Sequence, residues 1–101
     1  MLVVHHLNNS RSQRILWLLE ELELPYEVKR YEREPSMRAP AALRAVHPLG
    51  KSPVVADGPR ILAETGAIVE YIVDRHGGGR LAPPPGSDAR LAWTYWLHYA
   101  E

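Results

Sequence analysis

Two short segments have residues suited to binding a small peptide-like ligand, one on each side of a predicted β-hairpin. Ser52-Pro53 directly precedes an apolar strand, and proline fits at a strand's first residue because it cannot donate a ladder hydrogen bond. If the Ser52–Pro53 bond is cis, the neighbouring backbone can offer its N–H and C=O to an extended ligand. Thr65 can cap the following helix, whose free N–H groups form an anion site. We therefore expect peptide pairing at one side and carboxylate binding at the other.

Composition excludes several kinds of chemistry. The chain has 101 residues, enough for one small domain, and its 12 basic and 12 acidic residues balance. This balance gives no indication of a nucleic-acid or membrane partner. There is no cysteine, which excludes disulfides, thiolate metal sites and thiol chemistry by the protein itself. No apolar run approaches the roughly 20 residues of a membrane span, and the N-terminus lacks a signal-peptide pattern, so we expect a cytoplasmic protein.

The histidines give no indication of a metal site. His5 and His6 are adjacent in a predicted strand, so their side chains point to opposite faces and cannot chelate one ion. His47, His76 and His98 are scattered along the chain. We therefore expect no metal, and neither a glycine-rich phosphate loop nor a Ser-His-Asp pattern is present.

Hydrophobic periodicity predicts an alternation of strands and helices. Apolar residues repeat at helical spacing up to about Glu23 and again after Thr65. Short runs rich in β-branched and aromatic residues predict the strands. The predicted strands are 2–7, 26–31, 54–56 and 60–63. The first predicted helix follows residue 10 and ends near Glu23, and the second spans 40–46. The third begins at Thr65, and the fourth spans 89–101.

This order predicts an α/β fold with a thioredoxin-like βαβαββα layout. The first two strands are joined by a helix and should be parallel, with a right-handed crossover. The last two are joined by a tight turn and should be antiparallel. We expect a four-stranded mixed sheet with helices on both faces in residues 1–80, a proline-rich linker in 81–88, and one aromatic-rich helix in 89–101.

Three segments resemble a known family. HHLNNSRSQRILWLLEELELPYEVKRY, HPLGKSPVV and LAETGAIVEYI resemble the N-terminal domain of glutathione transferases, especially the bacterial and fungal serine-type enzymes akin to the theta and zeta classes. The resemblance covers roughly residues 1–80. It implies a detoxifying homodimer that uses glutathione as co-substrate, without a metal, and directs its thiolate at a small electrophilic substrate. Residues 89–101 would be the first helix of a truncated C-terminal helical domain.

The resemblance places the catalytic hydroxyl at Ser10. A thiol with a pKa near 8.5 is only about 3% ionised at pH 7, and lowering that pKa by about two units requires roughly 2.7 kcal/mol. A charge-assisted hydrogen bond at a helix N-terminus can supply this stabilisation. Ser10 in this position could also be a simple helix cap, and Asn9, Arg11 and Ser12 are alternative donors on the sulfur side.

The cysteinyl and glycyl parts of glutathione would bind near the predicted cis-proline. The resemblance assigns the main chain of Ser52, beside Pro53, to the cysteinyl part. It assigns the ammonium of Lys51 to a glutathione carboxylate, and Arg38 is a second candidate for the glycyl carboxylate. The alternative for Lys51 is a solvated loop residue.

The γ-glutamyl end would bind at the next helix. The resemblance assigns the Thr65 hydroxyl and N–H to its carboxylate and Glu64 to its amino group. Thr65 stands where serine is commoner in the family, but the hydroxyl is kept. As a pure helix cap Thr65 would look the same, so the adjacent Glu64 favours the binding role.

The C-terminal part departs most from the family. Such enzymes are roughly twice as long, and their second domain supplies most of the electrophile pocket. The large aromatic residues of 89–101 predict a face that this chain can scarcely cover. We therefore expect either part of a longer protein or a last helix that packs in a dimer. Alone, the chain should bind glutathione weakly and turn over little.

Two alternative functions stay open. One is a glutathione-dependent disulfide reductase or peroxidase that uses the same site. The other is a non-catalytic interaction module built on a transferase-like domain. The set of Lys51, Ser52-Pro53 and Glu64-Thr65 argues against the module, because docking alone does not require all of these residues.

Overall fold

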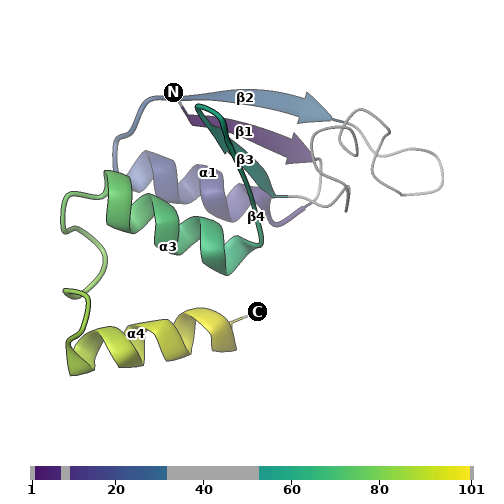
Figure 1. The fold of residues 1–101 in the computed structure, drawn as a ribbon. Helices are drawn as coiled ribbons and strands as arrows, with labels where there is room; N and C mark the ends of the chain where they lie inside the picture. The colour runs from purple at the N-terminus through teal and green to yellow at the C-terminus, as the bar shows by residue number, and fades with distance from the viewer. Residues whose placement is uncertain (1, 8–9, 32–52, 101) are drawn as a thin grey trace.

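A computed structural model describes residues 2–7, 10–31 and 53–100. Its elements follow the predicted order, with ends that coincide or differ by at most two residues (Figure 1). The predicted helix at 40–46 lies outside the described residues. The elements are β1 (Leu2–Leu7), α1 (Ser12–Glu21), β2 (Tyr26–Tyr31), β3 (Val54–Asp57), β4 (Arg60–Ala63), α3 (Thr65–His76) and α4 (Asp88–Tyr99).

The four strands form one mixed sheet in the order β2-β1-β3-β4. β1 and β2 are parallel, with Leu2 opposite Tyr26. β3 is antiparallel to both β1 and β4. This arrangement confirms the thioredoxin-like mixed sheet.

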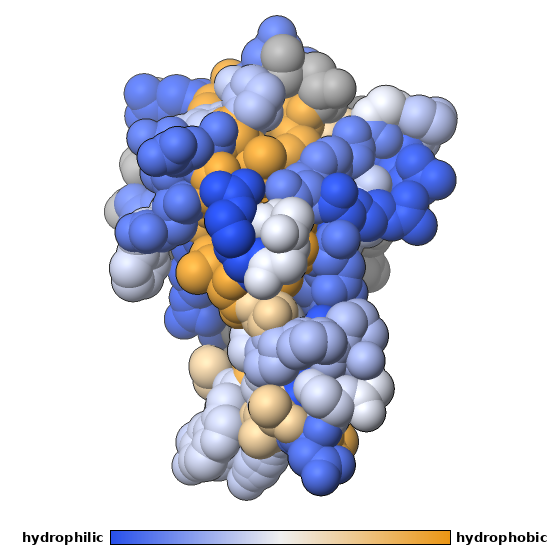
Figure 2. Space-filling model, turned by 90° about the vertical axis from the view of Figure 1, so that its left-hand side faces the viewer, coloured by the Kyte–Doolittle hydropathy of each residue, from blue (hydrophilic) through white to orange (hydrophobic). Residues whose placement is uncertain are grey.

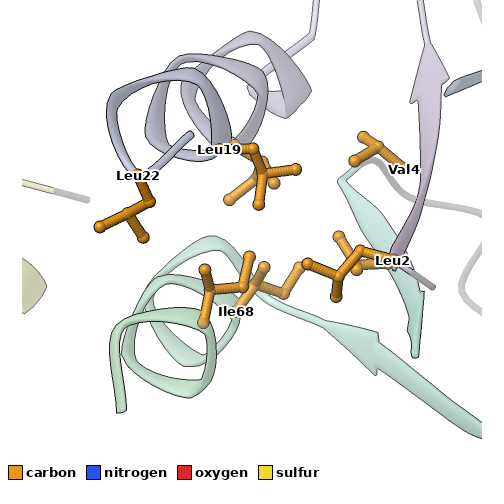
Figure 3. Packing of buried hydrophobic residues seen from close by; sticks show 8 residues of the cluster. Leu2, Val4, Leu19, Leu22 and Ile68 are labelled. Atoms are coloured by element: carbon orange, nitrogen blue, oxygen red, sulfur yellow. The ribbon is translucent and has the colours of Figure 1, made fainter. Parts of the chain in front are cut away.

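The main core lies between one face of the sheet and the helices α1 and α3. Figure 1 shows these helices side by side beneath the sheet, and Figure 3 shows their leucine and isoleucine side chains meeting those of β1. Full burial of each such side chain stabilises the fold by about 1.5–3 kcal/mol before entropic costs. The predicted helical periodicity is thus confirmed. The buried cluster contains Leu2, Val4, Ile15, Leu19, Leu22, Val55, Ile68 and Ile72.

The opposite face of the sheet carries a second buried cluster of Leu7, Tyr31 and Val54. His5 is buried on this face, where its Nδ1 lies 2.9 Å from the Tyr31 hydroxyl oxygen. His6 instead contacts α1. The two histidines therefore face opposite sides of the sheet, as strand alternation predicts.

Helix α4 is attached to α3 mainly through Arg90. Its guanidinium donates to both carboxylate oxygens of Asp74 at 3.0 and 3.1 Å and to the Pro83 carbonyl at 3.2 Å. It also lies 4.5 Å from the centre of the Trp93 ring. Ser87 caps the helix by accepting from the Arg90 N–H. These contacts explain why an arginine is buried here.

The outer face of α4 is uncovered, as its aromatic content predicts. Figure 2 shows the α4 end of the molecule below an apolar band that polar side chains flank. An apolar groove between α1, α3 and α4 continues this surface, with Leu18, Val69 and Trp96 among its lining residues. The large apolar side chains of α4 that are 52–72% exposed are Leu91, Tyr95, Trp96 and Tyr99.

We expect Arg90→Met to loosen α4 while leaving the sheet folded. The variant keeps the apolar stem but loses the hydrogen bonds to Asp74 and Pro83, which should cost about 1–2 kcal/mol because Asp74 is partly exposed. Hydrogen exchange should show faster exchange of α4 amides and unchanged protection in β1. Arg60→Met, which removes an exposed arginine of β4, is the control. Equal protection of α4 in both variants would contradict this anchoring role.

Candidate functional site

Strand register brings three candidate residues to one edge of the sheet. His5 of β1 pairs with Val54 at the start of β3, and Val54 pairs with Ala63 at the end of β4. The end of β1, the start of β3 and the end of β4 therefore share this edge. Pro53 directly precedes β3, whereas Ser10 comes three residues after the end of β1 and Thr65 two residues after the end of β4. We call this edge, with Ser10, Pro53, Glu64 and Thr65, the candidate site.

The candidate site has a span that suits a tripeptide. β1 and β4 are separated by β3, and two strand spacings of about 4.8 Å give about 10 Å. Three extended residues reach about 10 Å as well. A ligand of that length can therefore extend from the end of β1, past the start of β3, to the start of α3.

The Ser10 hydroxyl belongs to a hydrogen-bonded chain at the start of α1. It is half-buried and donates to the Leu7 carbonyl at 2.6 Å. Its oxygen lies 2.7 Å from the Ser12 hydroxyl and accepts from the Ser12 N–H at 3.3 Å. Ser12 in turn makes a short hydrogen bond with Nδ1 of His6. The N-cap residue of α1 is Arg11, so Ser10 is not the simple helix cap of the alternative interpretation.

The alternative sulfur-side donors differ in accessibility. Ser12 is completely buried, and its hydroxyl is engaged by Ser10 and His6. Arg11 is exposed, whereas Asn9 lies outside the described residues. Of the two serines, Ser10 is therefore the more accessible to a ligand.

Glu64 holds a strained backbone conformation directly before α3. Its φ of 74° and ψ of 120° lie in a region that side chains other than glycine rarely adopt. Such conformations cost about 1–3 kcal/mol and cluster at functional sites. Glu64 is exposed, and its side chain does not cap the helix. The next residue, Thr65, is buried at the helix start, where N–H groups and the helix dipole favour an anion.

Pro53 is buried directly before β3, as predicted for a proline that begins a strand. Four predicted site residues lie outside the described part of the chain, so their roles stay predictions. These are Asn9, Arg38, Lys51 and Ser52.

His6 is a part of this site that sequence reasoning missed. The sequence analysis considered it only as a metal ligand paired with His5. Strand alternation carries the missing signal, because even-numbered residues of β1 face the α1 side and His6 is the last of them. Burial, and secondarily the charge of Arg30, lowers the pKa of His6.

A second polar cluster lies at the opposite end of the sheet. The Tyr71 hydroxyl donates to Asp57 Oδ2 at 2.6 Å, and His76 Nε2 lies 3.0 Å from the same oxygen. The hydrogen bond from Tyr71, supported by that from His76, lowers the pKa of Asp57. The same hydrogen bond raises the pKa of Tyr71. This cluster ties α3 to the end of β3 and is remote from the candidate site.

Among residues 2–7, 10–31 and 53–100, no three histidine, cysteine or carboxylate side chains gather as metal ligands would. Nor does this part of the chain contain a helix with the length and apolarity to cross a membrane.

Residues 1–74 match the family model for the glutathione S-transferase N-terminal domain. The chain is 45% identical to glutathione S-transferase 3 of Schizosaccharomyces pombe, over all of the chain and 41% of that protein. A crystal structure of a glutathione S-transferase from Actinobacillus pleuropneumoniae shares 45% identity with a TM-score of 0.89, over 97% of this chain and 46% of that one. A family member from Pseudomonas fluorescens, solved with two glutathione molecules bound, shares 30% identity with a TM-score of 0.80, over 97% of this chain and 44% of that one. The chain thus spans less than half the length of these relatives.

We expect the Asp57 cluster to make stability depend on pH in the acid range. Because the folded state lowers the pKa of Asp57, its contribution is present above the ordinary carboxyl pKa of about 4. It is lost as the pH falls through the lower folded-state value. Urea unfolding of Asp57→Asn should therefore show a flatter decline of the free energy of unfolding below about pH 4.

Glu27→Gln, which removes an exposed carboxyl group of β2, is the matched control for Asp57→Asn. If the free energy of unfolding of Asp57→Asn declines below about pH 4 as steeply as that of the wild type, protonation of Asp57 does not cause the decline.

Proposed function

This chain belongs to the glutathione S-transferase family, and from that premise we propose that it binds glutathione and stabilises its thiolate for attack on an electrophilic substrate. In the proposed reaction the glutathione sulfur forms a bond to an electrophilic carbon and a leaving group departs from that carbon. The chain's own residues supply binding and a hydrogen bond to the sulfur. No group of the protein becomes a nucleophile.

The observation that carries this proposal is the half-buried Ser10 hydroxyl at the start of α1. Its proton is directed at the Leu7 carbonyl, and rotation about the Cβ–Oγ bond would redirect it to a bound sulfur while the oxygen stays in place. The hydroxyl then donates a charge-assisted hydrogen bond, and the nearby helix N-terminus adds a favourable dipole. Together these can stabilise a thiolate by the roughly 2.7 kcal/mol that a two-unit pKa shift requires.

The other half of the site suits the backbone and carboxylate of a tripeptide. We propose that the main chain at Ser52-Pro53 pairs with the cysteinyl part and that Thr65 and the α3 N-terminus hold the γ-glutamyl carboxylate. Glu64 would receive the γ-glutamyl amino group. Lys51 and Arg38 would contact the glycyl carboxylate. The common sheet edge and its span of about 10 Å support this arrangement.

The electrophile pocket requires a separate proposal, because the chain spans only 41–46% of the length of the two relatives that are 45% identical to it. We propose that a helical region comparable to theirs covers the exposed face of α4 and supplies that pocket. A homodimer follows from the family resemblance and a cytoplasmic location from the sequence pattern, and both stay predictions.

We expect Ser10→Ala to raise the pKa of bound glutathione and to lower conjugation at neutral pH. Loss of the charge-assisted hydrogen bond should raise this pKa by about one to two units, which corresponds to about a 10- to 100-fold loss of thiolate below that pKa. The thiolate's ultraviolet absorbance, titrated in the complex, measures the shift. Conjugation of a chloronitrobenzene substrate measures the loss of rate. Ser87→Ala, which removes the serine cap of α4, is the control.

The outcomes of this experiment separate the competing functions. Lost conjugation with retained disulfide reduction in Ser10→Ala would favour the reductase or peroxidase. Absence of glutathione binding by calorimetry at millimolar ligand would favour the interaction module. An unchanged thiol pKa in Ser10→Ala would overturn the role proposed for Ser10.

We expect Glu64→Gly to make the fold more stable and glutathione binding weaker. Glycine accepts the positive φ of this position, which should add about 1 kcal/mol to the free energy of unfolding after its own entropic cost. Loss of the carboxylate that would face the γ-glutamyl amino group should raise the Kd about 10-fold. Urea unfolding and calorimetry measure the two effects.

Glu64→Gln separates charge from strain, because glutamine keeps the side-chain length and the strained backbone. It should weaken binding without the gain in stability. If Glu64→Gly binds glutathione as tightly as the wild type, the proposed contact is wrong.

A further inference from the structure

We infer that Ser12 and His6 are positioning residues that hold the Ser10 oxygen and direct its proton outward, toward the sulfur of a bound thiolate. This inference rests on the proposed function, since it concerns the hydroxyl that would meet glutathione. The sequence analysis considered Ser12 only as an alternative donor to the sulfur and gave His6 no role in the site. The inference comes from the hydrogen-bonded chain that joins β1 to the start of α1.

The direction of each hydrogen bond in the chain follows from counting protons. Ser10 has one hydroxyl proton, and the Leu7 carbonyl can only accept it. The Ser12 hydroxyl must therefore donate across the 2.7 Å to the Ser10 oxygen. Its own oxygen then accepts from His6, so Nδ1 of His6 must carry a proton. The chain runs His6 to Ser12 to Ser10 and ends with the Ser10 proton on the Leu7 carbonyl.

Ser12 and His6 act through Ser10, because their own polar groups do not face a ligand at the candidate site. Ser12 is completely buried, and its hydroxyl already donates to one oxygen and accepts from one nitrogen. The Ser12 N–H also points at the Ser10 oxygen, at 3.3 Å. Ser10 thus accepts two hydrogen bonds from Ser12, and these hold its oxygen while its proton turns from the Leu7 carbonyl to a ligand.

Hydrogen bonds accepted by a hydroxyl strengthen the one that it donates. Cooperative strengthening is about 10–30% per bond, and Ser10 accepts twice from Ser12 while His6 polarises the donor. A polarised Ser10 hydroxyl is a better donor to a thiolate than an isolated one. The chain should thus add to the lowering of the thiol pKa that Ser10 causes by itself.

The arrangement does not require His6 to be charged. The pKa of His6 is lowered by burial and then by Arg30 of β2, which favours neutral imidazole at pH 7. An imidazole with its proton on Nδ1 donates to Ser12 of α1 in both the neutral and the charged form. The donor is therefore preserved over the pH range in which the bound thiol ionises.

Three variants test this inference, with the pKa of bound glutathione as the readout. Ser12→Ala removes the middle of the chain, and His6→Leu removes its first donor. Each should raise the thiol pKa by about 0.5 to 1 unit, a three- to tenfold loss of thiolate below that pKa. His6→Asn is the matched control, because its amide nitrogen can stand where Nδ1 stands and donate to Ser12. It should keep the thiol pKa within about 0.3 unit of the wild type.

The binding constant separates positioning from simple support of the fold. Calorimetry well below the thiol pKa measures binding of the neutral thiol, and all three variants should keep its Kd within about twofold. A general loosening of the β1–α1 turn would instead raise this Kd and would not be rescued by asparagine. Thermal unfolding identifies a variant that fails to fold. If Ser12→Ala does not fold, the comparison of His6→Leu with His6→Asn tests the positioning role without it.

The outcomes distinguish this inference from the proposed function. If Ser10→Ala raises the thiol pKa but Ser12→Ala and His6→Leu do not, the positioning role is wrong and the role of Ser10 stands. Equal pKa rises in His6→Leu and His6→Asn would also overturn it. If the protein binds no glutathione, or Ser10→Ala leaves the thiol pKa unchanged, the proposed function fails and this inference fails with it.

Discussion

The antiparallel pairing of β3 with β1 is the constraint on which the candidate site depends. It places the first residue of β3 beside the end of β1 and, through β4, brings the start of α3 to the same edge. Residues more than 50 positions apart in the sequence thereby meet within about two strand spacings. A slip of one residue in this register would exchange the two faces of β3 and separate Val55 from the core of α1 and α3. The core therefore fixes the geometry of the site.

Stability is distributed unevenly over the chain. The sheet, α1 and α3 share one buried cluster, whereas α4 depends on the contacts of Arg90 and leaves most of its large side chains exposed. The strained Glu64 lies between β4 and α3, at the helix start that would hold a carboxylate. The surrounding strand and helix can hold such a conformation because both are packed into the core. The candidate site thus lies beside the buried core of the sheet, α1 and α3.

The order of strands and helices could be predicted from the sequence, because apolar periodicity and turn residues determine each element locally. Ile15, Leu19 and Leu22 repeat at helical spacing and are buried. The strain at Glu64 and the chain from His6 to Ser10 could not be predicted in this way. Both depend on how β1, β4 and the helix starts meet in space, and a backbone dihedral or a hydrogen-bond direction leaves no periodic signal. Strand alternation placed His6 on the α1 face but did not identify its partner.

In the proposed function the ligand brings the sulfur, since this chain contains no cysteine, and the chemistry would depend on the strength and direction of one donor. A free serine hydroxyl rotates and exchanges hydrogen bonds with water, which weakens its effect on an anion. The half-buried Ser10, held from behind by a fully buried Ser12, lacks that freedom. Preorganised donors of this kind need no reorganisation when charge develops on the ligand. Burial of Ser12 thus has a functional consequence, since the same side chain that packs at the start of α1 restricts the hydroxyl that faces the candidate site.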